Sequence, residues 1–498
     1  MLEPEIIEAV AGYIACPETW FAFLSALPSY ALRPPLQSQL RLYPAVLPRG
    51  PRLVLHKISP EHVADIRTAM ALYSTVELAD WSAPSRNVAC VGGTADVAVS
   101  NVKSLAALEV AVRSWPMRLI GVKLDVGPEA LFSAAHAVAA SHLLRDTCPN
   151  LASLDVCWQR PVEPAEQDAL VTCICASKLA HLRLASFMTI VMSDDNTRRL
   201  AAWMRSAPLA SVVFESVAFA MQSEALVCHA LRRQAPALTS LKLAFTSSLA
   251  RALLNGRRLP RTLPSLEIVG SIETVDVAPS MAAMMAESLA DSKLTHCTLS
   301  SNHCLHNPEV ACLLLGALPH MTDLVYLNLT YNGLDTLACE VLAAHLPKIP
   351  QLQTLNLENN FLRDVGAAII ATALPHCATL TTLHLGHNFI GDVGVRALCM
   401  AVPGCRRLST LTLGGNDVTA IGAAQLAKMV QVTSTLTTLD VALNPHLQAD
   451  GVLRLLNGLH ASPQRVQLTV SGRSLPPKQL RKCQSLIEQL DLPATLLL

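Results

Sequence analysis

The sequence is poor in aromatic and charged residues. Of its 498 residues, 4% are aromatic and 15% are charged, and the formal net charge is +0. A protein that binds nucleic acid needs a basic surface, so this charge balance argues against nucleic-acid binding. The hydrophobic content of 51% suits a thin structure in which most residues lie close to a core.

Motifs of several enzyme classes are also missing. No Gly-Lys dipeptide occurs, which excludes the phosphate-binding loop GxxxxGK[ST], and neither HExxH nor GxSxG is present. The sequence therefore predicts a protein without enzymatic activity and without a cofactor.

Long apolar runs and closely paired cysteines are absent too. No uncharged apolar run reaches the roughly 18–20 residues that cross a bilayer. The start at Met1–Glu5 is acidic, whereas a secretory signal begins with basic residues. The 15 cysteines form no CxxC pair, and several stand at apolar repeat positions. We expect no membrane segment and a reducing compartment, the cytoplasm and/or the nucleus.

What the sequence does contain is a repeated pattern, Leu-x-x-Leu-x-Leu-x-x-Asn. It runs from Leu324 to Asn332 and returns four times, ending at Asn360, Asn388, Asn416 and Asn444, so that each step is 28 residues. This pattern is typical of a leucine-rich repeat. Each block alternates apolar and polar residues as a short strand does. The asparagine amides should bond to turning backbone and stack as a ladder.

The rest of each repeat predicts a helix. Apolar and small residues recur at helical spacing in 365–374, 393–401 and 421–430. A 28-residue repeat with full helices resembles the ribonuclease-inhibitor class of leucine-rich-repeat proteins. That resemblance implies an α/β fold: a right-handed solenoid, or horseshoe, with parallel strands on the concave face and helices on the convex face.

Four segments are predicted along the chain. Residues 1–47 form an α-helical segment, 48–292 hold degenerate repeats, 293–470 hold regular repeats, and 471–498 form a C-terminal capping helix. Within the degenerate part most asparagines are lost, so those turns must be satisfied in another way. Segment 82–100 shows no repeat pattern and is predicted to be a loop.

The N-terminal segment has two open interpretations. Its three short helices ahead of a solenoid resemble an F-box, although the pattern departs from that family after Pro17. The resemblance implies docking to a Skp1-type adaptor of a cullin ubiquitin ligase, through Leu2, Pro4, Ile6, Ile7, Trp20 and Phe21. The alternative is a helical cap that shields the apolar edge of the first repeat.

The polar strand positions of the regular repeats are the candidate site for a protein partner. They are Tyr326, Asn328, Thr330, Tyr331, Thr354, Asn356, Glu358, Thr382, His384, Thr410, Thr412 and Asp440. Tyr326, Tyr331 and His384 are the expected anchors, because aromatic residues concentrate interface energy. Gly386, Gly414 and Ala442 predict a groove of bare backbone. The alternative is that threonine merely suits exposed strand positions.

A metal site is not expected. His296, Cys297, His303, Cys304 and His306 have suitable residue types for zinc. The repeat register, however, points the cysteines into the core and the first two histidines away from it.

The leading hypothesis is a monomeric, non-enzymatic protein-binding scaffold, with an F-box-type substrate receptor as its specific form. The alternative is GTPase activation, because the solenoid also resembles the Ran GTPase-activating protein family. That family typically carries a long acidic tail, which this chain lacks. Direct inhibition of a basic nuclease fits least well, because the expected concave face is nearly uncharged.

Overall fold

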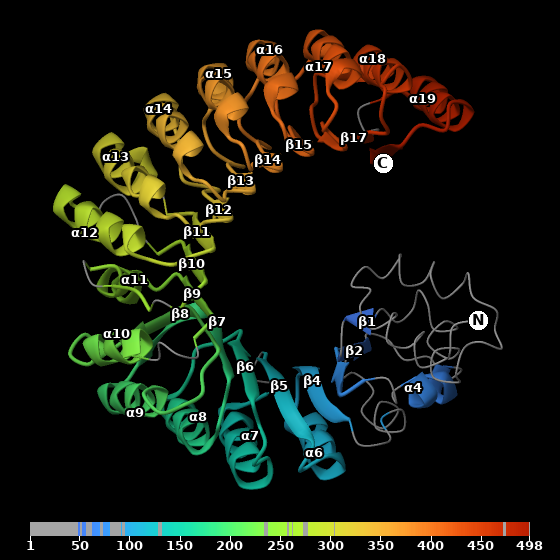
Figure 1. The fold of residues 1–498 in the computed structure, drawn as a ribbon. Helices are drawn as coiled ribbons and strands as arrows, with labels where there is room; N and C mark the ends of the chain where they lie inside the picture. The colour runs from blue at the N-terminus through green and yellow to red at the C-terminus, as the bar shows by residue number, and fades with distance from the viewer. Residues whose placement is uncertain are drawn as a thin grey trace, which may run out of the picture. The chain divides into compact units, whose positions relative to one another are not determined.

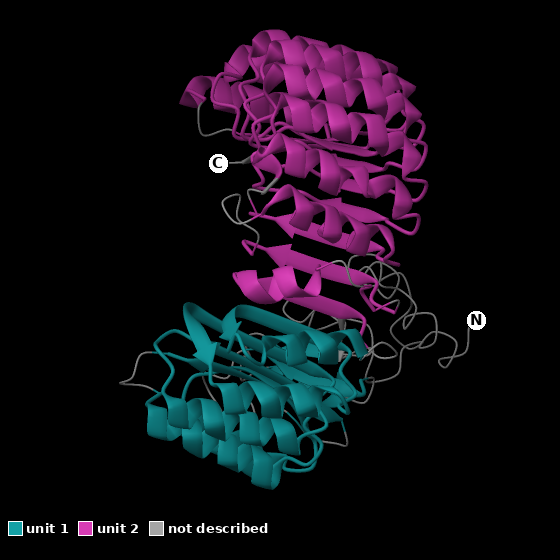
Figure 2. Ribbon diagram, turned by 90° about the vertical axis from the view of Figure 1, so that its left-hand side faces the viewer, with its two compact units in different colours: residues 1–237 teal, residues 238–498 magenta. Residues whose placement is uncertain are grey.

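The computed structural model describes residues 48–49, 52–55, 62–69, 73–79, 91, 95–127, 132–233, 238–255, 258–260, 262–271, 277–302, 304–471 and 475–497. The chain divides into two compact units, residues 1–237 (unit 1) and 238–498 (unit 2), which Figure 2 colours separately. The segment predicted to be F-box-like or a cap, 1–47, lies outside the described residues. No helix in the described parts of the chain has the length and apolar character needed to cross a membrane.

Unit 1 alternates strands with helices along one sheet. Its strands are β1 Pro48–Arg49, β2 Arg52–Leu55, β3 Thr75–Leu78, β4 Asp96–Val102, β5 Leu119–Val126, β6 Ser153–Trp158, β7 His181–Met192 and β8 Ser211–Phe219. Its helices are α4 Val63–Ala69, α6 Leu105–Ser114, α7 Ala134–Thr147, α8 Pro164–Ala176, α9 Asp194–Met204 and α10 Glu224–Arg233. From β2 to β8 each strand pairs in parallel with the next, whereas β1 is antiparallel to β2.

One expectation for unit 1 is wrong. Strand β4 lies partly within 82–100, the segment predicted to be a loop, and it pairs with β3 and β5. Val97, Val99 and Val102 fill the positions that leucines fill elsewhere, and all three are buried. The register shifts between Val99 and Val102, next to Asn101 with its positive φ of 60°. This irregularity hides the nine-residue pattern.

Unit 2 repeats the same strand–helix alternation more regularly. Its strands are β9 Ser240–Ala244, β10 Ser265–Val269, β11 His296–Ser300, β12 Tyr326–Asn328, β13 Thr354–Asn356, β14 Thr382–His384, β15 Thr410–Thr412, β16 Thr438–Asp440, β17 Gln467–Ser471 and β18 Ala494–Leu497. Its α-helices are α11 Ser247–Leu253, α12 Pro279–Ala290, α13 Pro308–Gly316, α14 Thr336–His345, α15 Arg363–Ala373, α16 Asp392–Ala401, α17 Ala420–Val432, α18 Gln448–His460 and α19 Pro477–Gln489.

The strands of unit 2 pair in parallel in chain order, and the helices lie on the other side of the sheet (Figure 1). The central leucines of β12 to β16 stand in register and are fully buried: Leu327, Leu355, Leu383, Leu411 and Leu439. Each helix covers this row from one side, so neighbouring repeats share a continuous core. The fold is therefore an α/β leucine-rich-repeat solenoid, as predicted.

A ladder of buried asparagines holds the turns of unit 2, as the sequence predicts. The backbone N–H of Asn332 donates to Oδ1 of Asn360 at 2.9 Å, and that of Asn388 donates to Oδ1 of Asn416 at 2.9 Å. The degenerate repeat before this block uses Ser271 in the same place. Its hydroxyl accepts from the N–H of Thr246 at 3.0 Å, and its own N–H donates to Oδ1 of Asn302 at 3.0 Å.

The C-terminal prediction is only partly right. Helix α19 forms as expected, with Cys483 buried. A further strand, β18, follows it and pairs in parallel with β17. Its four residues, Ala494–Leu497, are too few to show a strand period in the sequence.

Candidate functional site on the strand face of unit 2

The polar positions singled out in the regular repeats share one face of the sheet. Tyr326, Thr354, Thr382, Thr410 and Thr438 are partners in register, and so are Asn328, Asn356, His384, Thr412 and Asp440. All of them are half-buried, while the leucine between each pair is buried. The predicted common face of these two rows is therefore confirmed, and binding of a partner to it stays a prediction.

Tyr331 lies apart from those two rows. It occupies the turn after β12 with a positive φ of 56° and is exposed. Residues with positive φ also precede the ladder asparagines of the next repeats, at Asn359, His387 and Leu443. Tyr331 therefore belongs to the rim of the sheet rather than to its open face.

A hollow of about 430 Å³ opens at the N-terminal end of this face. Its lining comes from four neighbouring strands: Lys242 on β9; Ser265, Glu267 and Val269 on β10; His296, Thr298 and Ser300 on β11; and Tyr326 and Asn328 on β12. We call it the Tyr326 hollow. Only Tyr326 and Asn328 were predicted as site residues. The others precede Tyr326 in the chain, on outward positions of β9 and β10 in the degenerate repeats and of β11 in the first regular repeat.

A stacked aromatic pair forms one wall of the Tyr326 hollow. The rings of His296 and Tyr326 have centroids 5.7 Å apart and planes inclined by 23°. Burial raises the pKa of the Tyr326 phenol, and the nearby carboxylates of Glu267 and Glu358 raise it further. A phenol keeps its proton at physiological pH, so the Tyr326 hydroxyl can donate a hydrogen bond.

The charges in the hollow are balanced. Lys242 Nζ lies 3.0 Å from Glu267 Oε2, and both side chains are little more than one-third exposed. The hollow therefore combines an aromatic surface, hydroxyl groups and one ion pair, without a net field that would select a strongly charged ligand.

A second polar cluster lies two strands further along. The Thr412 hydroxyl donates to Glu358 Oε1 at 3.3 Å, while His384 Nδ1 lies 3.1 Å from the same hydroxyl and 3.9 Å from Glu358 Oε1. Glu358 also covers Gly386: a β-carbon there would lie 3.2 Å from Glu358 Oε1. The expected groove of bare backbone is therefore closed at Gly386, because a neighbouring side chain folds over it.

The strand face of unit 1 has a different character. Arg183 bridges two carboxylates at 2.9 Å each, Asp155 on β6 and Glu215 on β8, and Lys123 on β5 lies 3.9 Å from Asp155. These side chains neutralise one another across four strands. The strand face of unit 1 therefore carries charged side chains that pair with one another. In this it differs from the nearly uncharged face predicted for the regular repeats.

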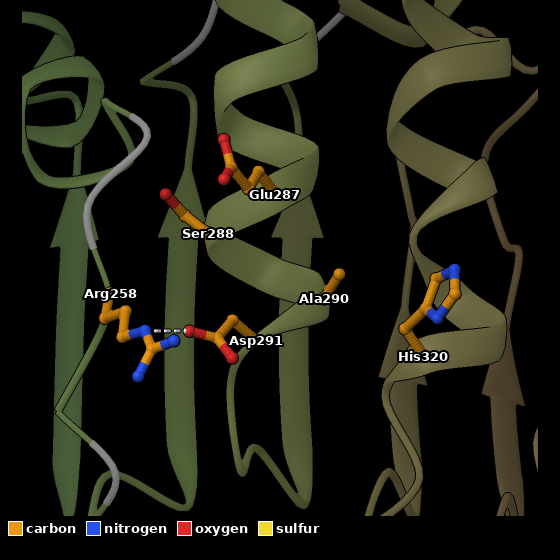
Figure 3. A pocket seen from close by; sticks show the side chains of 6 residues that line it. All are labelled: Arg258, Glu287, Ser288, Ala290, Asp291 and His320. Carbon is orange, nitrogen blue, oxygen red and sulfur yellow. Dashed lines mark ion pairs between the residues drawn. The ribbon is translucent and has the colours of Figure 1, made fainter.

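A hollow on the helix side of unit 2 is a weaker candidate. It measures about 370 Å³ and is lined by Arg258, Glu287, Ser288, Ala290, Asp291 and His320 (Figure 3). Arg258 Nε lies 2.5 Å from Asp291 Oδ2, so its charge is already paired within the chain. Arg257 and Arg261, close to Arg258 in the sequence, lie outside the described residues.

The His/Cys cluster is split by the sheet. Cys297 is buried in the core, whereas His296 stacks on Tyr326 on the open face. The side chains of His303 and Cys304 lie outside the described residues. Among the described residues, no three His, Cys, Asp or Glu side chains are grouped so that they could hold a metal ion.

Comparison with known proteins agrees with the repeat architecture. The family described as Leucine Rich repeat matches residues 376–399. The sequence matches no curated protein. The chain is thus built from leucine-rich repeats, as its sequence period and its fold both show.

Two solved structures resemble this chain at low identity and low TM-score. An internalin from Listeria monocytogenes is 16% identical with a TM-score of 0.36, and the match covers 72% of this chain and 82% of the internalin. Leiomodin-1 actin-binding site 2 is 17% identical with a TM-score of 0.26, and the match covers 37% of this chain and 89% of that one. Such low similarity carries no argument about function.

Proposed function

We propose that this chain is a non-enzymatic protein-binding scaffold that holds a segment of a partner protein on the strand face of unit 2. The observation that carries the proposal is the Tyr326 hollow, where a stacked aromatic pair stands beside half-buried polar side chains. Aromatic residues that are already held in place lose little entropy on binding, so they are favourable anchors.

The chemistry of the hollow indicates what would enter it. The His296–Tyr326 pair presents a ring surface suited to a planar side chain, either an aromatic ring or an arginine guanidinium. Beyond the hollow, the threonine row from Thr354 to Thr438 offers hydroxyl groups at each strand step of about 4.8 Å. An extended or looped segment lying across the strands would meet these hydroxyls one after another.

A photo-crosslinker in the hollow tests the proposal. Tyr326→p-benzoylphenylalanine should capture one protein from lysate of the native cell, whereas the same group at Gln431, exposed at the end of α17, should not. The captured protein is then purified. Its affinity for the chain should fall about tenfold or more with Tyr326→Ala and stay unchanged with Gln431→Ala. Equal capture at both positions, or unaltered affinity of Tyr326→Ala, would refute the strand-face site.

The F-box-type substrate receptor is the specific form of this scaffold. It depends on 1–47, which lie outside the described residues, so it stands on the sequence resemblance alone. Replacing Trp20 and Phe21 with alanine and measuring binding of a Skp1-type adaptor tests it. Absence of adaptor binding by the unaltered chain would leave the N-terminal segment as a cap. GTPase activation stays the alternative, tested by GTP hydrolysis of Ran and related small GTPases with and without the chain.

A further inference from the structure

A line of exposed apolar side chains runs along the rim of unit 2, where the turns enter the helices. One residue in the first turn of each of four successive helices takes part, always 28 residues apart, and two phenylalanines join from the preceding turns. The exposed fractions are 42% for Leu337, 57% for Val365, 61% for Val393, 66% for Ile421, 51% for Phe361 and 56% for Phe389. We call these six residues the rim stripe.

The centre of the rim stripe is shaped for insertion of a side chain. The rings of Phe361 and Phe389 are stacked, with centroids 5.9 Å apart and planes inclined by 11°. Together with Arg363, Asp364 and Val365 they line a hollow of about 370 Å³. Single exposed apolar residues are ordinary on protein surfaces, but a continuous patch with its own hollow is typical of a binding site.

The fold does not need these side chains for its core. In each repeat the neighbouring positions supply the packing, for example Gly394 and Val395 after Val393, which are both buried. The same first-turn position is apolar in α14, α15, α16 and α17, although it is exposed to water in all four helices. A partner protein that covered these side chains would remove their apolar surface from water.

Two exposed arginines lie beside the centre of the rim stripe. The guanidiniums of Arg363 and Arg396 are exposed and have no ion-pair partner among the residues that the structure describes. The nearby carboxylates keep their charge, which the starts of the next helices partly offset: Asp364 Oδ1 accepts from the N–H groups of Gly391 and Gly394, each at 2.8 Å. Asp392 makes the equivalent bonds one repeat later, each at 2.9 Å. Toward the two ends of the rim stripe, the exposed side chains of Glu340 and Asp417 carry negative charge.

We propose that the rim stripe docks an amphipathic α-helix of a partner protein, with one apolar residue per heptad and acidic residues beside its two middle heptads. Packed helices lie about 8–10 Å apart, so the four helix residues of the stripe offer an apolar side chain at about that interval. Seven residues of α-helix rise about 10.5 Å, which matches this step, whereas a strand would turn alternate side chains away from it. The acidic residues would pair with Arg363 and Arg396.

This surface is separate from the Tyr326 hollow, so the two proposals stand or fall independently. The probe is a synthetic labelled helix of about four heptads, with leucine once per heptad and glutamate beside the two middle leucines. A matched peptide carries lysine in place of the glutamates. Binding of each to the full chain is measured by fluorescence anisotropy.

Four variants of the full chain decide the outcome. Val393→Ser and Phe389→Ser should each weaken the acidic peptide about tenfold. Val432→Ser is the matched control: Val432 is 68% exposed at the far end of α17, and its change should have no effect. Reversing both charges with Arg363→Glu and Arg396→Glu should transfer the preference to the lysine peptide.

Several results would overturn the proposal. No saturable binding of the acidic peptide, equal binding of both peptides, or equal loss in Val393→Ser and Val432→Ser would each do so. A measurement of molecular mass by light scattering could give one more contradicting result. If the unaltered chain is a dimer that Phe389→Ser makes monomeric, the stripe is an interface between two copies of this chain.

Discussion

The buried asparagines hold the turns of the regular repeats through side-chain hydrogen bonds to the backbone. The side-chain amide of Asn388 donates to the carbonyl oxygens of Leu357 at 2.8 Å, Gly386 at 3.0 Å and Leu385 at 3.2 Å. It is fully buried, so water cannot replace those bonds if the amide is removed.

Asn388→Ala should therefore lower the free energy of unfolding by about 2–4 kcal/mol. Gln353→Ala is the control, because Gln353 is exposed on the same repeat array and the change should cost less than about 0.5 kcal/mol. Urea denaturation followed by circular dichroism measures both. Equal stability of the two variants would show that the ladder does not hold the turns.

Buried and exposed cysteines should differ in the reactivity of their thiols. Burial raises the pKa of the Cys339 thiol to about 12. At pH 8 only about one such thiol in ten thousand would be ionised, and the thiolate is the reactive form. Cys312 on α13 is exposed.

Iodoacetamide at pH 8 should consequently modify Cys312 within minutes and leave Cys339 unmodified until the chain unfolds. Peptide mass spectrometry of the native protein, with a sample in denaturant as control, measures the difference. Rapid modification of Cys339 in the native protein would mean that its repeat opens locally.

At the scale of whole elements, helices α16 and α17 are each capped by an aspartate of the repeat before them. Asp392 on α16 accepts from the N–H groups of Thr419 and Gly422 at the start of α17, and from the Thr419 hydroxyl at 2.6 Å. A β-carbon at Gly422 would lie 2.4 Å from Asp392 Oδ1, so glycine is required for this approach. The carboxylate satisfies N–H groups that a helix start leaves unpaired.

Asp392→Ala should cost about 1–2 kcal/mol of stability, since it removes a cap and a link between two repeats. Asp417→Ala is a suitable control, because Asp417 is exposed in the turn before the same helix. Thermal unfolding of both variants at equal concentration gives the comparison. A loss as large in Asp417→Ala would mean that general charge, rather than the cap, matters.

The elements that the sequence predicts well are those whose period is regular. Strands β12 to β16 and helices α15 to α17 follow directly from leucine and asparagine positions, because each repeat buries the same side chains. Strand β4 is not predicted from the sequence, because valines stand in place of leucines and the register shift at Asn101 breaks the period. Ser271 replaces asparagine in the ladder because its hydroxyl oxygen also accepts from an N–H of the preceding repeat, that of Thr246, and the leucine pattern does not encode this exchange.

The candidate site is predictable only in part for a related reason. Alternation places Tyr326 and Asn328 on the open face, but the Tyr326 hollow also needs Lys242 and Glu267 from degenerate repeats and His296 from the repeat before Tyr326. Which outward side chains stack, pair or fold over a neighbour depends on contacts between repeats. The closure of Gly386 by Glu358 is such a contact, and a single repeat gives no sign of it.

For the whole molecule, the repeat construction implies that disturbances spread only to neighbours. In unit 2 each strand pairs with the preceding and following strands, so stability approximates a sum of local terms. A defect at one repeat should loosen adjacent repeats most, and repeats several steps away least.

Hydrogen exchange of Asn388→Ala tests this expectation across the full chain. Amides of β13 and β14 should exchange about tenfold or more faster than in the unaltered protein, while those of β5 to β8 in unit 1 should keep their rates. The reason is that the lost amide bonds only to residues of its own and the preceding repeat. The control is Gln353→Ala, which should leave both sets unchanged. Faster exchange by the same factor in every strand would instead mean that the chain opens as one cooperative body.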